Sequence, residues 1–467
     1  MRKTKILCTV GPATESVETL QSLIEAGANI FRLNMSHAKH DWCAEVVQRI
    51  RQAAEQAQSD VAVLVDLQGP SIRTGPVDGS FDLKEGDAVE FTMGGAVAKI
   101  PFSTSVNYDG LGGDLKVGDK MQVDNGVLHM RVTAIDAERV TCSVITPGQM
   151  GSRRHINLPG IRVSLPPLTD KDHADLAMAV RVQADFVAMS FVRDAAHVAL
   201  LKGLLKEQGS LARVVAKIED QQAVANLEGI IEAADAVMVA RGDLGIEVQL
   251  EELPIVQRRI IKKCVHMGRK VIVATHMLES MTENPVPTRA EVTDVANAAY
   301  EEADAVMLSG ETSVGKYPVR CVEVLDKVCR RTELSGGVGY AEHSPLKTEK
   351  HKIVKSAVVL ANSMPDAKIV VFTKHGVMAH YTAHLRPKYA PIFAFCPALD
   401  VCRSLIMSRA VHPMQLDFET EKPEPAIDAA VRLLKAKNYI HDGDPLILIS
   451  DVLYGEFKWD SIILKRA

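Results

Sequence analysis

The sequence predicts an α/β protein: a (β/α)8 TIM barrel, with an all-β lid domain inserted after the third strand and a C-terminal α/β domain. Three observations predict it. Eight short apolar runs each end at polar residues, helical periodicity lies between most of these runs, and one long stretch loses that periodicity. The chain has 467 residues, too many for one compact core, so more than one domain is expected.

The eight apolar runs are the predicted barrel strands. A parallel strand covered on both faces is apolar until it emerges from the sheet. Strands that alternate with helices form βαβ units, and eight such units close into a barrel whose chemistry lies at the C-terminal strand ends. The strands are expected at residues 5–10, 29–34, 61–66, 186–191, 213–219, 236–243, 270–275 and 305–309, with helices between them, for example at 16–26, 194–207 and 254–267.

The stretch from residue 70 to residue 165 has a different pattern. Short alternating runs are separated there by Gly-Asp turns, as at Gly86-Asp87 and Gly118-Asp119, which predicts the hairpins of a small all-β domain. A domain inserted after a barrel strand would overhang the catalytic face. We therefore expect a lid that closes over phosphates and excludes water, rather than a passive insertion. Thr169 then supplies an N-cap for the helix that resumes the barrel.

The barrel pattern ends near residue 334 and is followed by a glycine-rich linker. The predicted domains are the barrel (1–69 and 166–334), the lid (70–165) and a C-terminal α/β domain (340–467). In the last domain, helices are expected at 352–363 and 425–437, and strands at 368–373, 391–396 and 445–450. Its motifs carry little chemistry, so a regulatory or assembly role is expected.

Composition excludes several classes of function. The net charge of −5 argues against binding to nucleic acid or to an anionic membrane. Eight cysteines without a CxxC pair suggest neither a zinc knuckle nor a disulfide framework. The sequence shows no N-terminal signal pattern and no apolar run of about 18 residues. A cytoplasmic enzyme with no membrane partner is expected.

Polar residues gather at the strand ends where barrel chemistry occurs. Lys217 and Glu219 are two residues apart, so both side chains leave the strand on one face, and Asp243 follows the next strand. Two carboxylates and an ammonium group can hold a divalent metal ion and an anionic substrate together. One such carboxylate is often half of a structural ion pair, but the pairing favours a metal site. The strand-end set is Arg32, Asn34, Asp66, Ser190, Lys217, Glu219, Asp243, Thr275 and Ser309.

These residues lie in runs that resemble the pyruvate kinase family. The family transfers the phosphoryl group of phosphoenolpyruvate to ADP, giving ATP and pyruvate in the final step of glycolysis. The resemblance therefore implies a phosphotransferase with these small-molecule partners, and a homotetramer. It covers the barrel and lid strongly and the C-terminal region weakly, through CTVGPAT (8–14), FRLNMSH (31–37), VAKIE (215–219), ARGDLG (240–245), ATHMLESM (274–281), NPVPTRAEV (284–292) and MLSGET (307–312).

The resemblance implies a role for each catalytic residue. Glu219 and Asp243 would ligate Mg²⁺ or Mn²⁺, and Lys217 and Arg32 would bind the transferring phosphoryl group as catalytic residues.

For the rest of the substrate, the resemblance implies four further residues. Gly242 and Thr275 would hold the substrate carboxylate, and Ser190 belongs to the same substrate-binding set. The enolate formed by transfer must gain a proton, and Thr275 and Ser309 would belong to a relay of hydroxyls and water that delivers it. Each hydroxyl could instead cap the segment that follows it.

The resemblance also implies nucleotide contacts. Arg73, near the lid hinge, would contact the transferring phosphoryl group or the nucleotide. His37 and Arg154 match positions that contact the nucleotide, and Asp124 matches a lid carboxylate near it. Arg154 stands where the family usually has lysine, which keeps the positive charge. Surface turns are the alternative interpretation of the lid positions.

A potassium site is implied but left open. In the family, K⁺ is held by side chains that match Asn34, Ser36 and Asp66 and by the carbonyl that matches Leu67. Ser71 stands where potassium-dependent members usually carry glutamate and potassium-independent members carry lysine. Serine supplies neither charge, so K⁺ dependence stays open.

The C-terminal region departs further from the family. Its phosphate-loop segment, residues 373–379, has Val377 where an arginine is usual, and residues 454–460 lack the usual effector loop. A phosphorylated effector, for example a monophosphate, and no effector are equally compatible with the sequence. Two other functions stay open: a Mg²⁺-dependent carbon–carbon lyase acting on pyruvate or phosphoenolpyruvate, and a catalytically silent metabolite sensor. An intact Lys217, Glu219, Asp243 and Thr275 set argues against the sensor.

Overall fold

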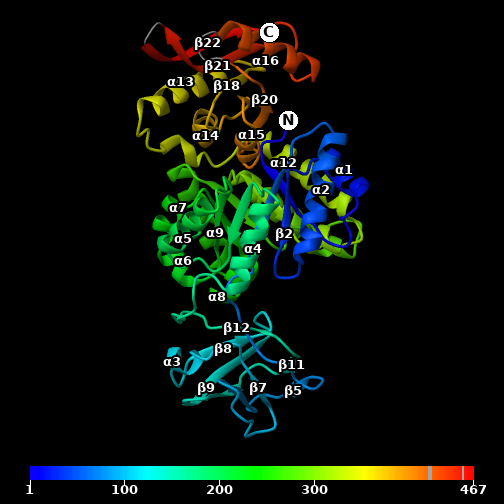
Figure 1. The fold of residues 1–467 in the computed structure, drawn as a ribbon, viewed down its shortest axis with the longest axis vertical. Coiled ribbons are helices and arrows are strands. Elements are labelled where there is room, and N and C mark those ends of the chain that lie inside the picture. The colour runs from blue at the N-terminus through cyan, green and yellow to red at the C-terminus, as the bar shows by residue number, and fades with distance from the viewer. Residues whose placement is uncertain (419–422, 455–456) are drawn as a thin grey trace.

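The computed structural model describes residues 1–418, 423–454 and 457–467. Figure 1 shows three units in a row: the barrel in the middle, the small β-rich unit at one end and the C-terminal α/β unit at the other. The N-terminus lies at the junction between the barrel and the C-terminal unit (Figure 1).

The predicted (β/α)8 barrel is confirmed. Eight parallel strands close in the order β1-β17-β16-β15-β14-β13-β3-β2. The sequence predicted them because each is apolar over its buried length. They are β1 (Lys5–Thr9), β2 (Ile30–Asn34), β3 (Ala62–Asp66), β13 (Phe186–Met189), β14 (Arg213–Ile218), β15 (Ala236–Ala240), β16 (Lys270–Ala274) and β17 (Ala305–Leu308).

Helices surround the barrel, and the three named in advance lie where the periodicity placed them. Ser16 and Asp194 cap two of them, and Thr169 forms a capping box with Asp172 at the start of α4. The surrounding elements are α1 (Val17–Ala26), α2 (His40–Gln56), α4 (Asp170–Arg181), α5 (Ala195–Glu207), α6 (Gln221–Ala225), α7 (Leu227–Ala233), α8 (Arg241–Glu247), α9 (Leu253–Met267), η1 (Glu279–Thr282), α10 (Arg289–Tyr300), α11 (Gly310–Ser313) and α12 (Pro318–Glu333).

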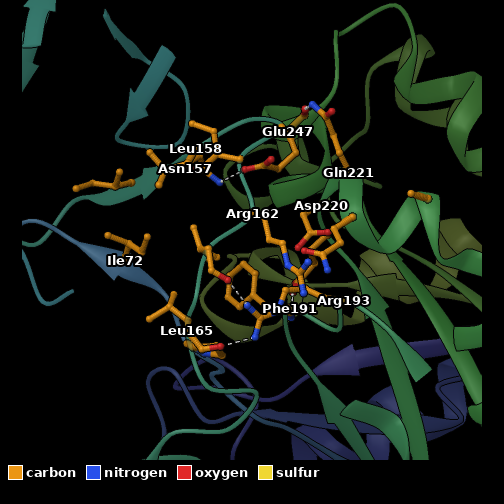
Figure 2. A pocket seen from close by; sticks show the side chains of 18 of the residues that line it. Ile72, Asn157, Leu158, Arg162, Leu165, Phe191, Arg193, Asp220, Gln221 and Glu247 are labelled. Carbon is orange, nitrogen blue, oxygen red and sulfur yellow. Dashed lines mark hydrogen bonds between the residues drawn. The ribbon is translucent and has the colours of Figure 1, made fainter. Parts of the chain in front are cut away.

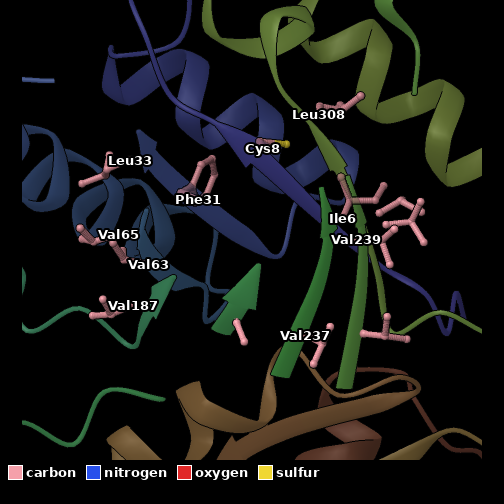
Figure 3. Packing of buried hydrophobic residues seen from close by; sticks show 14 of the residues in the cluster. Ile6, Cys8, Phe31, Leu33, Val63, Val65, Val187, Val237, Val239 and Leu308 are labelled. Carbon is pink, nitrogen blue, oxygen red and sulfur yellow. The ribbon is translucent and has the colours of Figure 1, made fainter. Parts of the chain in front are cut away.

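The barrel has two apolar layers, because successive strand residues point to opposite faces. Ile6 and Phe31 belong to the layer between strands and helices (Figure 3). Leu7 and Ile30, their neighbours in sequence, pack inside the barrel together with Met407 from the C-terminal unit. The C-terminal unit therefore contributes side chains to the interior at the N-terminal strand ends, and the opposite end is left for chemistry.

The inserted unit consists of two sheets. Its strands are β4 (Ile72–Arg73), β5 (Phe81–Leu83), β6 (Ala88–Thr92), β7 (Ser103–Ser105), β8 (Lys120–Val123), β9 (Leu128–Asp136), β10 (Arg139–Val144), β11 (Gly148–Met150) and β12 (His155–Asn157). Seven pair in the order β4-β12-β8-β9-β10-β6-β7, and β11 pairs with β5. The unit departs from a purely β structure by one helical turn, α3 (Leu111–Asp114), whose Leu111 packs in the core of the unit.

The C-terminal unit is a five-stranded sheet with the order β20-β19-β18-β21-β22. The sequence missed α14, α15, β20 and β22, which are short or carry polar residues that obscure their period. Residues 455–456 lie outside the described residues, so the interpretation of residues 454–460 falls partly outside them. The elements are η2 (Tyr340–His343), α13 (Glu349–Ser363), β18 (Lys368–Phe372), α14 (Val377–His384), β19 (Ile392–Cys396), α15 (Leu399–Leu405), β20 (Val411–Gln415), α16 (Pro423–Ala436), β21 (Pro445–Tyr454) and β22 (Phe457–Arg466).

A buried ion pair joins the C-terminal unit to the barrel. Arg386 donates two hydrogen bonds to the Asp304 carboxylate, at 2.8 and 2.6 Å. Asp304 also accepts from the backbone N–H groups of Arg409 and Val271. Burial alone would raise the pKa of Asp304, but Arg386 outweighs it and the pKa is lowered. This carboxylate fixes the two units to each other.

Candidate active site

Lys217 is at the centre of the polar cluster that the barrel strands present. Its ammonium donates to the Ser190 hydroxyl at 2.6 Å and lies 2.9 Å from Glu219 Oε1 and 3.3 Å from Asp66 Oδ1. Only 12% of the Lys217 side chain is exposed. Burial opposes the charge, but Asp66 and Glu219 outweigh it and raise the pKa of Lys217. The structure thus brings the predicted residues Lys217, Ser190, Glu219 and Asp66 into contact, and these contacts hold the Lys217 ammonium in place.

Arg32 adds a second fixed cation. Its Nε donates to Asp66 Oδ2 at 2.7 Å, and its Nη1 donates to the Thr9 hydroxyl at 3.0 Å. Asp66 lies between two cations; burial would raise its pKa, but Lys217 and Arg32 together lower it. A guanidinium and an ammonium held in this way are suited to oxygen atoms that carry negative charge.

Glu219 and Asp243 provide the acidic side of the site. Glu219 Oε2 accepts from the Phe191 backbone N–H at 2.6 Å. Burial raises the pKa of Glu219 to about 7, Lys217 opposes that shift, and repulsion from Asp243 adds to it. Asp243 lies in the first turn of α8, and its Oδ1 is 3.6 Å from His155 Nδ1 of β12 in the inserted unit. A cation bound between Glu219 and Asp243 would neutralise the repulsion between these two carboxylates.

The donor set fits a hard divalent cation. Within the described residues, no cluster of three or more His, Cys, Asp or Glu side chains is arranged to hold a metal ion. Mg²⁺ needs no such cage, because it keeps several waters and takes one or two carboxylates together with substrate phosphate oxygens. Glu219 and Asp243 supply that number of carboxylates.

The segment that carries Thr275 is held in an unusual conformation. Thr275 has φ of 70°, which is an outlier for a β-branched residue and is typical of functional sites. Arg241 donates to the Thr275 carbonyl at 2.5 Å and is itself paired with Asp294 at 2.7 Å. A Cβ atom on Gly242 would lie 3.3 Å from Thr275 Cγ2, so a glycine lets α8 approach this segment closely.

Sequence reasoning missed the supporting roles of Phe191 and Arg241. Phe191 has φ of 53° and presents its N–H to Glu219, and neither feature has a signal in an apolar run. Arg241 lies in one of the resembling runs, but its partner Asp294 is far along the chain. Both residues position the groups that were predicted.

Ser309 and Thr275 follow the neighbouring strands β17 and β16, but no hydrogen bond among the described residues joins them. The Ser309 backbone N–H donates to Glu311 Oε2 at 2.7 Å, just before α11. Among the residues that the structure describes, the Ser309 side chain makes no hydrogen bond with any predicted site residue. A relay between the two hydroxyls would need water to connect them.

The predicted nucleotide residues are only partly assembled. Arg154 lies 3.2 Å from Asp124 across the inserted unit. Arg73 Nε donates to the Ser71 hydroxyl at 3.2 Å. His37 is exposed on the barrel, and no hydrogen bond or ion pair within the described ranges joins it to the arginines of the inserted unit.

The predicted potassium ligands make other contacts. Asn34 Oδ1 accepts from the Ser36 N–H at 3.2 Å, and the Leu67 carbonyl accepts from Ser190 at 2.8 Å. Asp66 has both carboxylate oxygens near Arg32 and Lys217. Its negative charge is therefore matched by side chains.

Comparison with known proteins decides which family these features belong to. The model of the pyruvate kinase barrel domain matches residues 1–322, and that of the pyruvate kinase alpha/beta domain matches residues 351–460. The chain belongs to the pyruvate kinase family. A pyruvate kinase from Geobacillus stearothermophilus is 40% identical over 471 residues, covering 97% of this chain and 78% of the relative.

Two other relatives support the same assignment. The chloroplastic pyruvate kinase isozyme G of Nicotiana tabacum is 40% identical over 452 residues, covering 96% of this chain and 80% of the relative. A crystal structure of a pyruvate kinase from Cryptosporidium parvum has a TM-score of 0.93 and 34% identity, covering 100% of this chain and 96% of that one. This member of the pyruvate kinase family is accordingly a phosphotransferase of the final step of glycolysis.

Proposed function

We propose that the Lys217 cluster is the phosphoryl-transfer centre, where phosphoenolpyruvate gives its phosphoryl group to ADP. One observation carries this proposal: a buried ammonium, a buried guanidinium and three carboxylates meet at the C-terminal ends of β2, β3, β14 and β15. Phosphoryl transfer needs positioning and charge neutralisation more than covalent chemistry from the protein. Fixed cations beside an acidic metal site supply both.

Glu219 and Asp243 would hold Mg²⁺ (or Mn²⁺). When bound, the ion would neutralise charge on substrate oxygens. Arg32 and Lys217 bind the phosphoryl group from the other side, and Asp66 keeps both cations in place. Ser190, which accepts from Lys217, orients the ammonium towards the substrate.

Gly242 and Thr275 would bind the substrate carboxylate, because the close approach of α8 brings backbone N–H groups to that side. The enolate left by transfer takes a proton at carbon. Thr275 would hold the water that delivers it, since a hydroxyl is a poor acid near neutral pH. Ser309 would take part through a further water.

The nucleotide would bind between the barrel and the inserted unit, with His37 on one side and Arg73, Arg154 and Asp124 on the other. We propose that residues 70–165 form a lid, residues 1–69 and 166–334 the barrel, and residues 340–467 the C-terminal domain. Lid closure would bring the arginines to the phosphates and exclude water.

Several assignments extend this proposal. Asn34, Ser36, Asp66 and the Leu67 carbonyl would form a K⁺ site that turnover does not require, because Arg32 and Lys217 already neutralise Asp66.

The described residues contain no helix long and apolar enough to cross a membrane. We place the enzyme in the cytoplasm as a homotetramer without a nucleic-acid partner, and a phosphorylated effector would bind the C-terminal domain.

Mn²⁺ binding tests the metal assignment. Free Mn²⁺ is measured by electron paramagnetic resonance with the purified enzyme and with Glu219→Gln and Asp243→Asn. Each variant should weaken binding by about tenfold or more, because it removes one of two charged ligands. Glu251→Gln, which removes an exposed carboxylate after α8, is the control and should bind Mn²⁺ normally. Normal Mn²⁺ affinity in both site variants would contradict the assignment.

A further inference from the structure

A cavity of about 460 Å³ adjoins the active site, with Glu219 in its lining, where the inserted unit meets the barrel. One wall is Ile72 of β4 and the end of β12 with the segment that follows it; the other is the end of β14, the start of α6 and the end of α8. Figure 2 shows Asn157 and Glu247 meeting across these two sides. The cavity is large enough for a drug-sized molecule.

Asn157 lines this cavity and has one polar side-chain atom without a partner. The residue is 5% exposed, and its Nδ2 donates to Glu247 Oε1 at 3.3 Å, as the dashed line in Figure 2 shows. Its Oδ1 is buried and has no hydrogen-bond partner among the described residues. A buried carbonyl oxygen without a donor is unfavourable, so this atom calls for a ligand that carries an N–H group.

Glu247 lacks a cation. It is 9% exposed, and it forms no ion pair with any residue in the described parts of the chain. Burial raises its pKa to about 7, the Asn157 hydrogen bond opposes the shift, and repulsion from Asp220 and Asp243 adds to it. The nearby guanidinium of Arg193 is already used, because it donates to the carbonyls of Val163 and Leu165.

The rest of the cavity surface is mixed: apolar side chains line one part, and Arg162, Arg193 and Asp220 line another. Ile72, Leu158 and Leu165 line the side towards the inserted unit, and Phe191, which follows β13, lines the barrel side (Figure 2). The cavity therefore presents a carboxylate and an amide oxygen at one place and an apolar surface beside them. A planar cation with two N–H groups can donate to both oxygens at once, while an apolar body covers the hydrocarbon.

We propose that this cavity is a binding site for a small amphipathic organic cation that carries an amidinium or guanidinium group on an apolar body. The cation donates to Glu247 and to Asn157 Oδ1. Because the walls of the cavity come from both the inserted unit and the barrel, a bound ligand fixes the distance between these two units. Turnover slows when the cavity is filled, since catalysis in such enzymes requires the covering domain to move.

Benzamidine is the probe, and benzamide is its neutral counterpart of nearly the same shape. Binding to the full-length enzyme is measured by titration calorimetry with saturating Mg²⁺, which keeps the probe away from Glu219 and Asp243. Benzamidine should bind at least about tenfold more tightly than benzamide, as expected for a charge-assisted pair. Comparable affinities of the two probes, or no binding of benzamidine, would overturn the proposal.

Two variants locate the site. Glu247→Gln should lose at least about tenfold in benzamidine affinity, and Asn157→Leu should lose several-fold, because each removes one acceptor. Glu251→Gln removes an exposed carboxylate outside the cavity and should change nothing. An unchanged affinity in Glu247→Gln would overturn the proposal. These outcomes are read from binding, so they do not depend on the catalytic roles proposed above.

Discussion

Replacing Lys217 with methionine keeps an unbranched side chain one atom shorter and removes its charge. The variant loses the ammonium that contacts Ser190, Glu219 and Asp66. A cation positioned on a transferring phosphoryl group contributes about 10³–10⁵-fold to turnover, so kcat should fall by at least about 10³-fold. Removing one partner of a buried ion pair costs about 3–5 kcal/mol. The cost should lie at the lower end, because Arg32 still pairs with Asp66 and Phe191 still donates to Glu219.

The assay couples pyruvate formation to NADH oxidation and is run beside thermal unfolding and Mn²⁺ binding. Mn²⁺ should still bind, because Glu219 and Asp243 remain. Lys202→Met is the matched control: it removes a half-exposed ammonium 3.0 Å from Asp235, away from the site. Such a pair contributes about 0–1 kcal/mol, and kcat should be unchanged. A folded Lys217→Met enzyme with kcat within about tenfold of the unmodified enzyme would refute the reasoning.

Three further predictions follow from individual contacts. Ser71→Glu should increase the stimulation of turnover by K⁺, because the added carboxylate calls for a compensating cation. The measurement is kcat with and without K⁺, and an unchanged response would contradict this prediction. Gly242→Ala should raise the KM for phosphoenolpyruvate while the melting temperature falls little, because the new Cβ would lie 3.3 Å from Thr275 Cγ2. A normal KM would argue against binding of the substrate carboxylate at Gly242 and Thr275. Asp304→Asn should cost about 3–5 kcal/mol near neutral pH. The pKa of Asp304 is lower in the folded protein than in the unfolded chain, where it is about 4. The ionised carboxylate therefore stabilises the folded protein above about pH 4, and this stabilisation is lost as the pH falls through the folded-state pKa. The difference in thermal unfolding should therefore narrow in acid, and a constant difference would contradict the ion-pair account.

The barrel could be predicted because its strands are buried on both faces and are apolar throughout, with polar residues only where they emerge. The contact between Lys217 and Glu219, observed at 2.9 Å, follows from their spacing along one strand. The contact of Lys217 with Asp66 follows from the order of strands around the barrel. It could be expected only after barrel closure was assumed.

Other features of the site could not be predicted from local pattern. Thr275 is left-handed where its carbonyl accepts from Arg241, and Arg241 is paired with Asp294 from another part of the chain. The cavity between Asn157 and Glu247 exists because the inserted unit returns to the barrel beside α8. Both features arise from tertiary contacts that override local preference.

The most direct test of the account is ATP formation by the purified enzyme from phosphoenolpyruvate and ADP. It is measured with and without Mg²⁺, and with and without K⁺. We expect ATP and pyruvate in equal amounts when Mg²⁺ is present, with activity retained without K⁺ because Arg32 and Lys217 already neutralise Asp66. No ATP formation with both ions present would contradict the assignment of the Lys217 cluster as a phosphoryl-transfer centre.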